Sequence, residues 1–474
     1  MKTYPVYLNG NWIVSETSAP VVNPASAEVF ANMSTVTAAR VAQAIQDAHA
    51  AFLDWRQVPG KARGEFLHKV ANELNRRREE IARLISLESG KPLSQSLGEI
   101  AMSVDHLRWF AEEARRIYGR VIPPHIASRR HWTVRQPVGV VAAMTPWNFP
   151  LMLAVRKVAA AIAAGCTVVH KPSLRTPFSA VAFGECLAES QPIKGLFQIV
   201  AGEAEMIAGE FLAHPLCRRL SFTGSTATGR KLAERAASHL KPLLLELSGN
   251  APALVFDDCD LSVAVNAVLL SKFRNSGQSC IAVNRIYVQR TIYPGFVQML
   301  TEKVKGLKLA SGLEPDAQVG PLIDPPALER ALEHIADAVN GGGKLLCGGK
   351  RARMPGYFLE PTVISEVPRT SLCMFEETFA PLAAITPFDT EREGVELAND
   401  SVYGLAAYVF TQNLSRAMRL ADSLSAGIVG INDGVPTNSQ SPFGGIKQSG
   451  WGRELGAEGI EAFLETKLVS LGLE

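Results

Sequence analysis

One cysteine stands in a stretch whose residue types could make it reactive. Cys280 closes the polar segment FRNSGQSC at residues 273–280, with Arg274 before it and Arg285 after it. Cationic neighbours and free backbone N–H groups lower the pKa of a thiol, whereas apolar surroundings raise it. A lone cysteine is more often a small buried apolar residue, so this stretch alone favours a structural role. A catalytic role for Cys280 needs support from the rest of the chain.

A carboxylate inside an apolar run is the second group that could do chemistry. Glu246 lies in the segment LLLELSGN, residues 243–250. Burying a glutamate is costly unless it is paired or protonated, and burial raises its pKa toward the range of a general base. A buried structural salt bridge explains the same pattern equally well.

Three short turns follow predicted strands, at the edge where open α/β sheets bind ligands. The turn TPWNFP at residues 145–150 contains Asn148, whose amide could donate to a developing oxyanion or simply cap a helix. The turn FTGSTATG at 222–229 could aim a helix N-terminus at a phosphate, although it matches neither GxGxxG nor a P-loop. Lys171, in KPS, could bind a cofactor or be solvated. Each signal is weak by itself.

The composition excludes several classes of function. The chain has 474 residues, of which 47% are hydrophobic and 20% charged, and its formal net charge is +2. These values suit two or three packed domains and give no electrostatic support for a nucleic-acid or membrane-surface partner. The 7 cysteines form no CxxC pair and the 9 histidines no HExxH motif, so we expect neither disulfides nor a metal site. With no apolar leader and no apolar run of membrane-spanning length, we expect a soluble, cytoplasmic protein.

Apolar strands that alternate with helices predict a doubly wound α/β fold. In the first set, strands are expected at residues 138–144, 167–170, 197–200, 220–222 and 243–247, with one intervening helix at 148–164. A second set has strands at 253–256, 285–288, 405–410 and 428–432, and a helix at 261–273 that leads into Cys280. Before these sets, helical spacing predicts helices at 61–74, 79–88 and 94–118, and residues 119–136 are typical of a protruding hairpin.

The motifs, in this order, resemble the aldehyde dehydrogenase superfamily, whose members oxidise aldehydes with NAD(P) through a cysteine thioester. The similarity covers almost the whole chain and rests on TPWNFP, KPS, FTGST, LELSGN, GQSC, EExFxP and PFGG in register. Within the superfamily, RQPVGVVAAMTPWNFP, FRNSGQSC and PFGGIKQSG are most similar to the succinate-semialdehyde dehydrogenase group.

The resemblance implies two doubly wound α/β domains, the first of them Rossmann-like, and a small β arm. Residues 1–118 and 138–248 would form the NAD(P)-binding domain, and residues 249–448 the catalytic domain. Residues 119–137 and 449–474 would form the oligomerisation element, in which the arm pairs with a strand at 467–470. A homodimer or homotetramer is implied.

The resemblance also assigns roles by position. Cys280 would be the nucleophile and Glu246 the base, while Asn148 and the backbone N–H of Cys280 would form the oxyanion hole. Lys171 would hold the adenosine ribose, Ser225 a phosphate and Glu377 the nicotinamide ribose, with Phe443 near the nicotinamide. The full set of expected cofactor-binding residues is Trp147, Lys171, Ser173, Gly224, Ser225, Glu377 and Phe443.

For the substrate, the resemblance implies an anion-binding pocket made by Arg156, Arg274 and Thr437. Succinate semialdehyde is the favoured substrate, because an arginine fork suits a carboxylate. Another short-chain or anionic aldehyde, such as phosphonoacetaldehyde, glutarate semialdehyde or a hydroxyaldehyde, stays open. A non-catalytic descendant of the superfamily is a further alternative, against which the presence of Cys280 and Glu246 speaks.

Some positions depart from the group's pattern. Ala282 stands where several semialdehyde dehydrogenases carry a second cysteine, so we expect no redox switch within this loop. Position 174 is Leu where NAD-preferring relatives often carry a carboxylate, and Arg175 beside it would tolerate a 2′-phosphate. Glu203 could oppose that phosphate. The sequence therefore leaves the choice between NAD and NADP open.

Overall fold

Five parallel strands form the centre of the first sheet. The computed structural model describes residues 1–190 and 193–473, and it orders these strands β12-β11-β8-β9-β10. Their bounds are β8 Val140–Met144, β9 Thr167–Lys171, β10 Phe197–Ile199, β11 Cys217–Thr223 and β12 Leu243–Glu246. The chain runs outward from β8 in one direction and then from β11 in the other, which is the Rossmann-like strand order that was predicted. The point of reversal lies between β8 and β11.

Short antiparallel strands close both edges of this sheet. β2 (Val6–Leu8) and β3 (Asn11–Ile13) form a hairpin on β10, and the two-residue turn between them has φ values of 47° at Asn9 and 80° at Gly10. At the other edge, β20 (Gly450–Trp451) pairs with β12. β20 lies in the segment 449–474, which the resemblance assigns to the oligomerisation element, yet it extends the first sheet.

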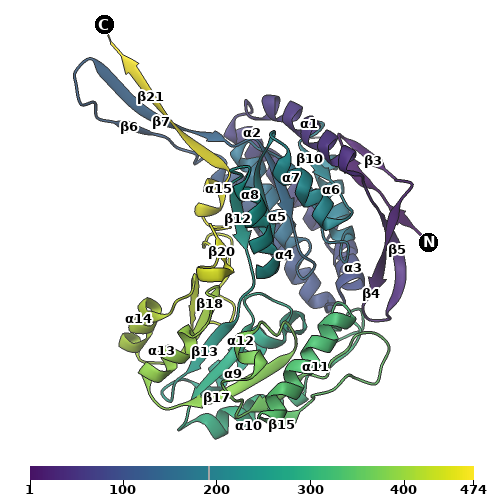
Figure 1. Cartoon of the computed structure of the whole chain (residues 1–474), viewed down its shortest axis with the longest axis vertical. Coiled ribbons are helices and arrows are strands. Elements are labelled where there is room, and N and C mark those ends of the chain that lie inside the picture. The colour runs from purple at the N-terminus through teal and green to yellow at the C-terminus, as the bar shows by residue number, and fades with distance from the viewer. Residues whose placement is uncertain (191–192, 474) are drawn as a thin grey trace.

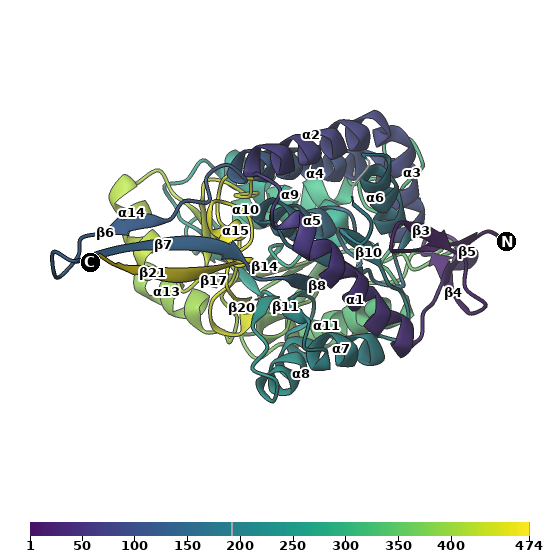
Figure 2. The same cartoon turned by 90° about the horizontal axis from the view of Figure 1, so that it is seen from above.

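Helices cover both faces of the sheet, as a parallel sheet requires (Figure 2). One face carries α2 Gly60–Arg76, α3 Arg78–Ser89, α4 Leu93–Glu113, α5 Met152–Ala164 and α6 Phe178–Glu189. The other face carries α1 Ala38–Trp55, α7 Ala204–Ala213 and α8 Thr226–Ala237. None of the helices in the described part of the chain is long and apolar enough to cross a membrane.

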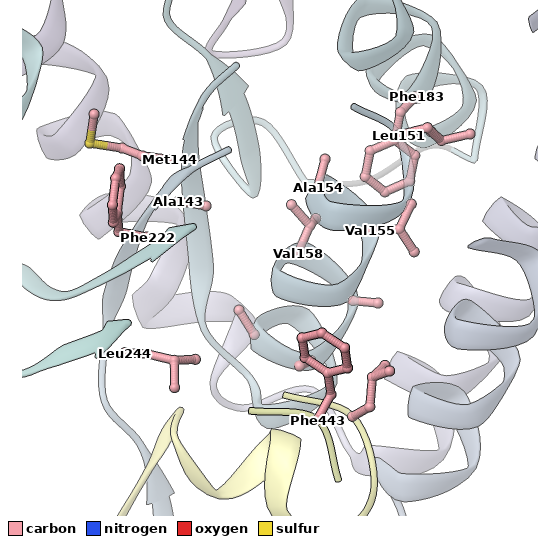
Figure 3. Close-up of a cluster of buried hydrophobic side chains, with 14 of the residues drawn as sticks. Ala143, Met144, Leu151, Ala154, Val155, Val158, Phe183, Phe222, Leu244 and Phe443 are labelled. Carbon is pink, nitrogen blue, oxygen red and sulfur yellow. The ribbon is translucent and has the colours of Figure 1, made fainter. Parts of the chain in front are cut away.

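The helix α5 is buried along almost its whole length, because it lies between the sheet and the outer helices α2 and α4. Its residues Leu153 to Ala164 are all buried, including Arg156 and Lys157. Figure 3 shows Val155 and Val158 of this helix within the apolar cluster, with Phe443 from the C-terminal part of the chain close by. A loop distant in sequence is thereby packed against the helix that carries Arg156.

The second sheet contains six parallel strands and has the order β15-β16-β17-β14-β13-β18-β19. Its strands are β13 Ala251–Val255, β14 Val283–Gln289, β15 Lys344–Cys347, β16 Thr362–Ser365, β17 Leu382–Phe388, β18 Ala406–Phe410 and β19 Ile428–Ile431. The helices are α9 Leu261–Phe273, α10 Tyr293–Lys305, α11 Pro325–Asn340, α12 Leu372–Phe375, α13 Glu391–Asn399 and α14 Leu414–Ser423. Only β15 is antiparallel, so the second α/β set is confirmed.

Two small three-stranded sheets complete the molecule, the first mixed and the second antiparallel. One contains β1 Thr3–Tyr4, β4 Ser18–Asn23 and β5 Glu28–Ser34. The other contains β6 Arg120–Ile122, β7 Arg129–Pro137 and β21 Leu464–Gly472, and it projects from the body with the C-terminus near its tip (Figure 1). β21 pairs with β7 from Leu464↔Pro137 to Gly472↔Arg129, so the predicted pairing of the arm with the C-terminal strand is confirmed. The short helix α15 (Glu458–Glu461) precedes β21.

Two helix boundaries differ from the prediction. The helix expected from residue 148 begins at Met152, because the carboxylate of Glu99 accepts hydrogen bonds from the N–H groups of Leu151 (3.0 Å) and Met152 (3.1 Å). A proline at position 150 also disfavours helical backbone at Phe149. The helix expected at 94–118 ends at Glu113. The predicted domain limits stay a prediction, and Glu474 lies outside the described residues.

Candidate active site

A cavity of about 390 Å³ is lined by residues of both halves of the molecule. Its walls include most of the predicted site residues: Trp147, Asn148, Arg156, Gly224, Ser225, Arg274, Cys280, Glu377, Thr437 and Phe443. The sequence analysis did not single out several others: Phe149, Met152, Ile281, Ile323, Asp324, Arg330 and Phe379. The apolar residues among them had no pattern that separated them from core residues.

The cysteine loop has a strained backbone held by neighbouring groups. Asn275, Ser276 and Gly277 have consecutive φ values of 52°, 56° and 74°, in the left-handed region that non-glycine residues rarely adopt. A Cβ at Gly277 would lie 2.1 Å from the carbonyl oxygen of Ala380. The Ser276 hydroxyl donates to the Gly320 carbonyl at 2.9 Å. These contacts fix the turn that presents Cys280 to the cavity.

Burial dominates the acidity of the Cys280 thiol. Desolvation raises the pKa of Cys280 to about 12, and the carboxylates of Glu377 and Glu246 add to this, while Arg156 opposes it. The expectation of an arginine on each side was wrong for Arg285, whose guanidinium donates to the carbonyls of Asn250, Leu397 and Ala398 instead. The thiol is therefore protonated at neutral pH, and its reaction requires that a base or a bound cation help it to ionise.

The amide of Asn148 is held at the cavity wall. Its Nδ2 donates to the Gln278 carbonyl at 3.1 Å, and an amide nitrogen has a second hydrogen for a further acceptor. The backbone carbonyl of Asn148 accepts from Lys91 Nζ at 2.8 Å and from Asn275 Nδ2 at 2.9 Å. Three hydrogen bonds thus orient this residue beside the cysteine loop.

Glu246 ends β12 as a buried carboxylate. Neither carboxylate oxygen of Glu246 has a hydrogen-bond partner among the described residues, and the side chain makes no ion pair with them. Desolvation, with the charge of Glu454 as a second cause, raises the pKa of Glu246 well above its ordinary value. The salt-bridge interpretation of this position is therefore not supported, whereas a raised pKa suits a general base.

A buried ion pair lies near Glu246 and was not predicted from the sequence. Lys157 of α5 pairs with Glu454 and also donates to the Ser221 hydroxyl at 3.0 Å. Both charged side chains are almost completely buried. Lys157 and Glu454 are 297 positions apart, so only the folded chain reveals the pair.

Three of the predicted cofactor residues, Trp147, Gly224 and Ser225, lie at the reversal point of the first sheet. Trp147 and Asn148 follow β8, and Gly224 and Ser225 follow β11. The Ser225 hydroxyl caps α8 by accepting from the Thr228 N–H at 3.2 Å, so the positive N-terminal end of this helix opens beside the cavity. This arrangement fits the phosphates of a dinucleotide.

Glu377 enters the cavity from the second half of the chain. It accepts from the Gly249 N–H at 3.0 Å, and burial raises its pKa to about 7. Such a fixed carboxyl group fits a ribose hydroxyl. Phe443 lies in the same cavity, with the guanidinium of Arg156 at 4.5 Å from its ring centroid.

Glu246, Lys171 and Ser173 do not contribute to the lining of this cavity among the described residues. Lys171 ends β9, next to β8, where burial lowers its pKa to about 8 and Glu203 opposes that shift. The Ser173 hydroxyl accepts from the Arg175 N–H at 3.2 Å. The three residues lie at or just after the carboxyl ends of strands, but they are not among the side chains that line the cavity with the other predicted site residues.

Two arginines share the cavity with Cys280. Arg156 is 3% exposed and Arg274 lies over the Phe149 ring at 5.7 Å. No carboxylate oxygen of a described residue lies within 4.0 Å of either guanidinium, and burial, with the charge of Arg156 as a further cause, lowers the pKa of Arg274. Arginine stays charged in proteins, so the two groups make a positively charged pocket beside the thiol. Thr437 lines the same cavity.

Comparisons with known proteins agree with this geometry. The sequence model of the aldehyde dehydrogenase family matches residues 12–469. A glutarate-semialdehyde dehydrogenase of Pseudomonas aeruginosa and an NADP⁺ succinate-semialdehyde dehydrogenase of Escherichia coli are both 44% identical to the chain over 468 residues, covering 98% of it and 97% of each relative. A crystal structure of an NADP-dependent E. coli enzyme superposes with a TM-score of 0.98 at 43% identity, covering 100% of this chain and 98% of that one.

The chain belongs to the aldehyde dehydrogenase family. It is an NAD(P)-dependent oxidoreductase that oxidises a small aldehyde, and it resembles succinate-semialdehyde dehydrogenases. Among the described residues, no group of three or more His, Cys, Asp or Glu side chains could hold a metal ion.

Proposed function

We propose that the protein oxidises a small anionic aldehyde to its carboxylic acid, with succinate semialdehyde as the favoured substrate. The pair Arg156 and Arg274 carries this proposal, because two unneutralised guanidinium groups beside the thiol of Cys280 are costly until an anion joins them. A dicarboxylic semialdehyde would place its carboxylate on the arginines and its aldehyde carbon at the sulfur.

Glutarate semialdehyde is a second candidate, because relatives named for either aldehyde are equally identical to the chain. Both carry a distal carboxylate, and they differ by one methylene. A hydrophobic pocket distinguishes one methylene by only about 10- to 200-fold. The charge at the end of the substrate opposite the aldehyde therefore contributes more to substrate selectivity than the length of the carbon chain does.

In the first half-reaction, Cys280 forms a covalent bond to the substrate. The thiol of Cys280 transfers its proton to a water molecule in the cavity, and Sγ attacks the aldehyde carbon to form a C–S bond while the C=O π bond breaks to give an alkoxide. The Asn148 amide and the Cys280 N–H donate to that alkoxide, and one such donor is worth about 3–4 kcal/mol in the transition state. A nicotinamide bound in the cavity would supply the hydride acceptor, and loss of hydride from the adduct would leave a thioester on Cys280.

In the second half-reaction, Glu246 activates water. Its buried, unpartnered carboxylate takes a proton from a water molecule, whose oxygen attacks the thioester carbon. The C–S bond then breaks, the carboxylic acid leaves, and Cys280 is regenerated. The raised pKa of Glu246 strengthens it as a base once it is ionised.

Both NAD and NADP are proposed as cofactors. Leu174 supplies no carboxylate against a 2′-phosphate, but Arg175 is already paired with Asp324 at 2.6 Å. Because Asp324 already neutralises Arg175, this arginine attracts a 2′-phosphate less strongly. Initial rates with each cofactor at equal concentration determine the preference.

The anion proposal is tested by Arg274→Ala. We expect the KM for succinate semialdehyde to rise about 10- to 100-fold, the value of a charged hydrogen bond, while the KM for butanal changes less than about twofold. Arg330→Ala is the matched control, since it removes a cavity arginine outside the predicted substrate pocket. Equal changes for the two aldehydes would refute the proposal.

We also propose a homo-oligomer assembled through the arm β6–β7–β21. The arm exposes large apolar side chains, including Val121 (86% exposed) and Leu468 (61% exposed). Exposed apolar groups on a projecting sheet are costly in water and favour a protein partner. A homodimer or homotetramer would cover them.

A further inference from the structure

A chain of hydrogen bonds runs from the surface of α4 to the guanidinium of Arg156. The Ser439 hydroxyl donates to the carboxylate of Asp105, and His106 Nδ1 lies 2.8 Å from the same hydroxyl. Arg156 Nε donates to His106 Nε2 at 3.3 Å. His106, Ser439 and Arg156 are all buried, and the three come from different parts of the chain.

The donors in this chain define one tautomer of the histidine. Arg156 has only donors, so His106 Nε2 must accept and Nδ1 must carry the hydrogen. Nδ1 then donates to the Ser439 oxygen, whose own hydrogen goes to Asp105. Every member is satisfied in one direction, from Arg156 to Asp105. Burial and the nearby Arg156 lower the pKa of His106 well below its ordinary value, which keeps the neutral form in place.

The chain holds one edge of the guanidinium and leaves another for a ligand. Nε is bound to His106, the group lies 4.5 Å from the Phe443 ring centroid, and Nη2 contacts the Met152 sulfur at 3.8 Å. The hydrogen bonds of the Arg156 side chain to described residues use Nε and Nη2, so Nη1 is left for a ligand in the cavity that Arg156 lines. A free arginine side chain loses rotamer freedom when it binds an anion, and Arg156 loses less because His106 already holds it.

We propose that His106, oriented by Ser439 and Asp105, is a positioning residue that fixes Arg156 for the distal anion of the substrate. It rests on the proposed function, because Arg156 must receive the anion. Ser439 lies two positions after Thr437, which lines the cavity.

Two replacements of His106 separate positioning from packing. His106→Phe keeps a ring but removes both hydrogen bonds, and His106→Gln can place an oxygen acceptor near the position of Nε2. We expect His106→Phe to raise the KM for succinate semialdehyde about tenfold, with kcat and the KM for butanal within about twofold, and His106→Gln to restore much of the loss.

A double variant tests whether the effect passes through Arg156. In an Arg156→Gln background, His106→Phe should change the KM for succinate semialdehyde by less than about twofold, because groups that act through one contact are not additive. Equal losses for both aldehydes, or full additivity in the double variant, overturn the inference. If the wild type itself does not favour the anionic aldehyde, and Arg274→Ala makes no difference, the proposed function fails instead.

Discussion

At the scale of single residues, the sequence could indicate candidate reactive groups but not their protonation. Cys280 and Glu246 were selected from their surroundings in the sequence, and the fold gives each of them a raised pKa. The upward shift of the Glu246 pKa could be predicted, because the residue lies in an apolar strand. The upward shift of the Cys280 pKa could not, because Arg285 bonds to carbonyl groups away from the thiol and burial outweighs Arg156. Which side of a strand end a side chain faces depends on the fold.

Glu246 should give deacylation a characteristic pH dependence. Because the pKa of Glu246 is raised well above its ordinary value, the carboxylate, which is the proposed base, becomes populated at higher pH than an ordinary glutamate. We therefore expect the single-turnover rate of thioester hydrolysis to increase with pH in the wild type. In Glu246→Gln the rate should fall by about 100-fold or more and lose this increase. A retained pH rise in the variant would assign the base to another group.

Glu377 should destabilise the cofactor-free protein at alkaline pH. Its pKa is about 7 when folded, above the ordinary value of 4.5, so the folded state favours the protonated form. That stabilisation is fully present below pH 4.5 and is lost as pH rises through about 7. Glu377→Gln should consequently raise Tm relative to the wild type more at pH 8.5 than at pH 4.5. An equal difference at both pH values contradicts the assignment.

At the scale of elements, strand positions were easier to predict than helix ends. The buried parallel strands appear as apolar runs in the sequence, so both α/β sets could be found. The start of α5 could not, because the group that holds its first N–H groups is Glu99, about fifty positions earlier. The same carboxylate also pairs with Lys91, which is eight positions before it. Contacts between distant segments set the boundary.

The pair Lys91–Glu99 should stabilise the turn that carries Asn148. Both side chains are 0% exposed, and Lys91 also donates to the Asn148 carbonyl. Removing one partner of a buried ion pair costs about 3–5 kcal/mol, because the other charge is left uncompensated. Lys91→Met should therefore lower the unfolding free energy more than the double change Lys91→Met, Glu99→Gln, as measured by denaturant unfolding. The reverse order would show that the pair is not coupled.

At the scale of the whole molecule, the arm and the β-sheets were predicted, but β20 was not. β20 extends the first sheet from a C-terminal segment, which brings Glu454 toward Lys157 and Phe443 toward α5. Figure 1 shows the arm projecting away from both sheets, where its apolar residues have few neighbours. The C-terminal part of the chain thus serves both the site and the projecting sheet.

The arm should determine the assembly state. Val121→Glu or Leu468→Glu would place a charge on the apolar surface that we expect a partner subunit to cover. Sedimentation velocity should then show a smaller assembly than the wild type. Leu240→Glu is the control, since Leu240 is 89% exposed and lies outside the arm. An unchanged assembly in both arm variants would place the subunit contact elsewhere.

The central claim is that Cys280 carries the acyl group of an anionic aldehyde. The most direct measurement mixes Glu246→Gln with cofactor and an equimolar pair of succinate semialdehyde and butanal, quenches in acid, and identifies the acyl group and its site by peptide mass spectrometry. The account predicts a succinyl thioester on Cys280 in excess over a butyryl one, and no adduct in Cys280→Ala. An adduct on another residue, or an excess of the butyryl thioester, would contradict it.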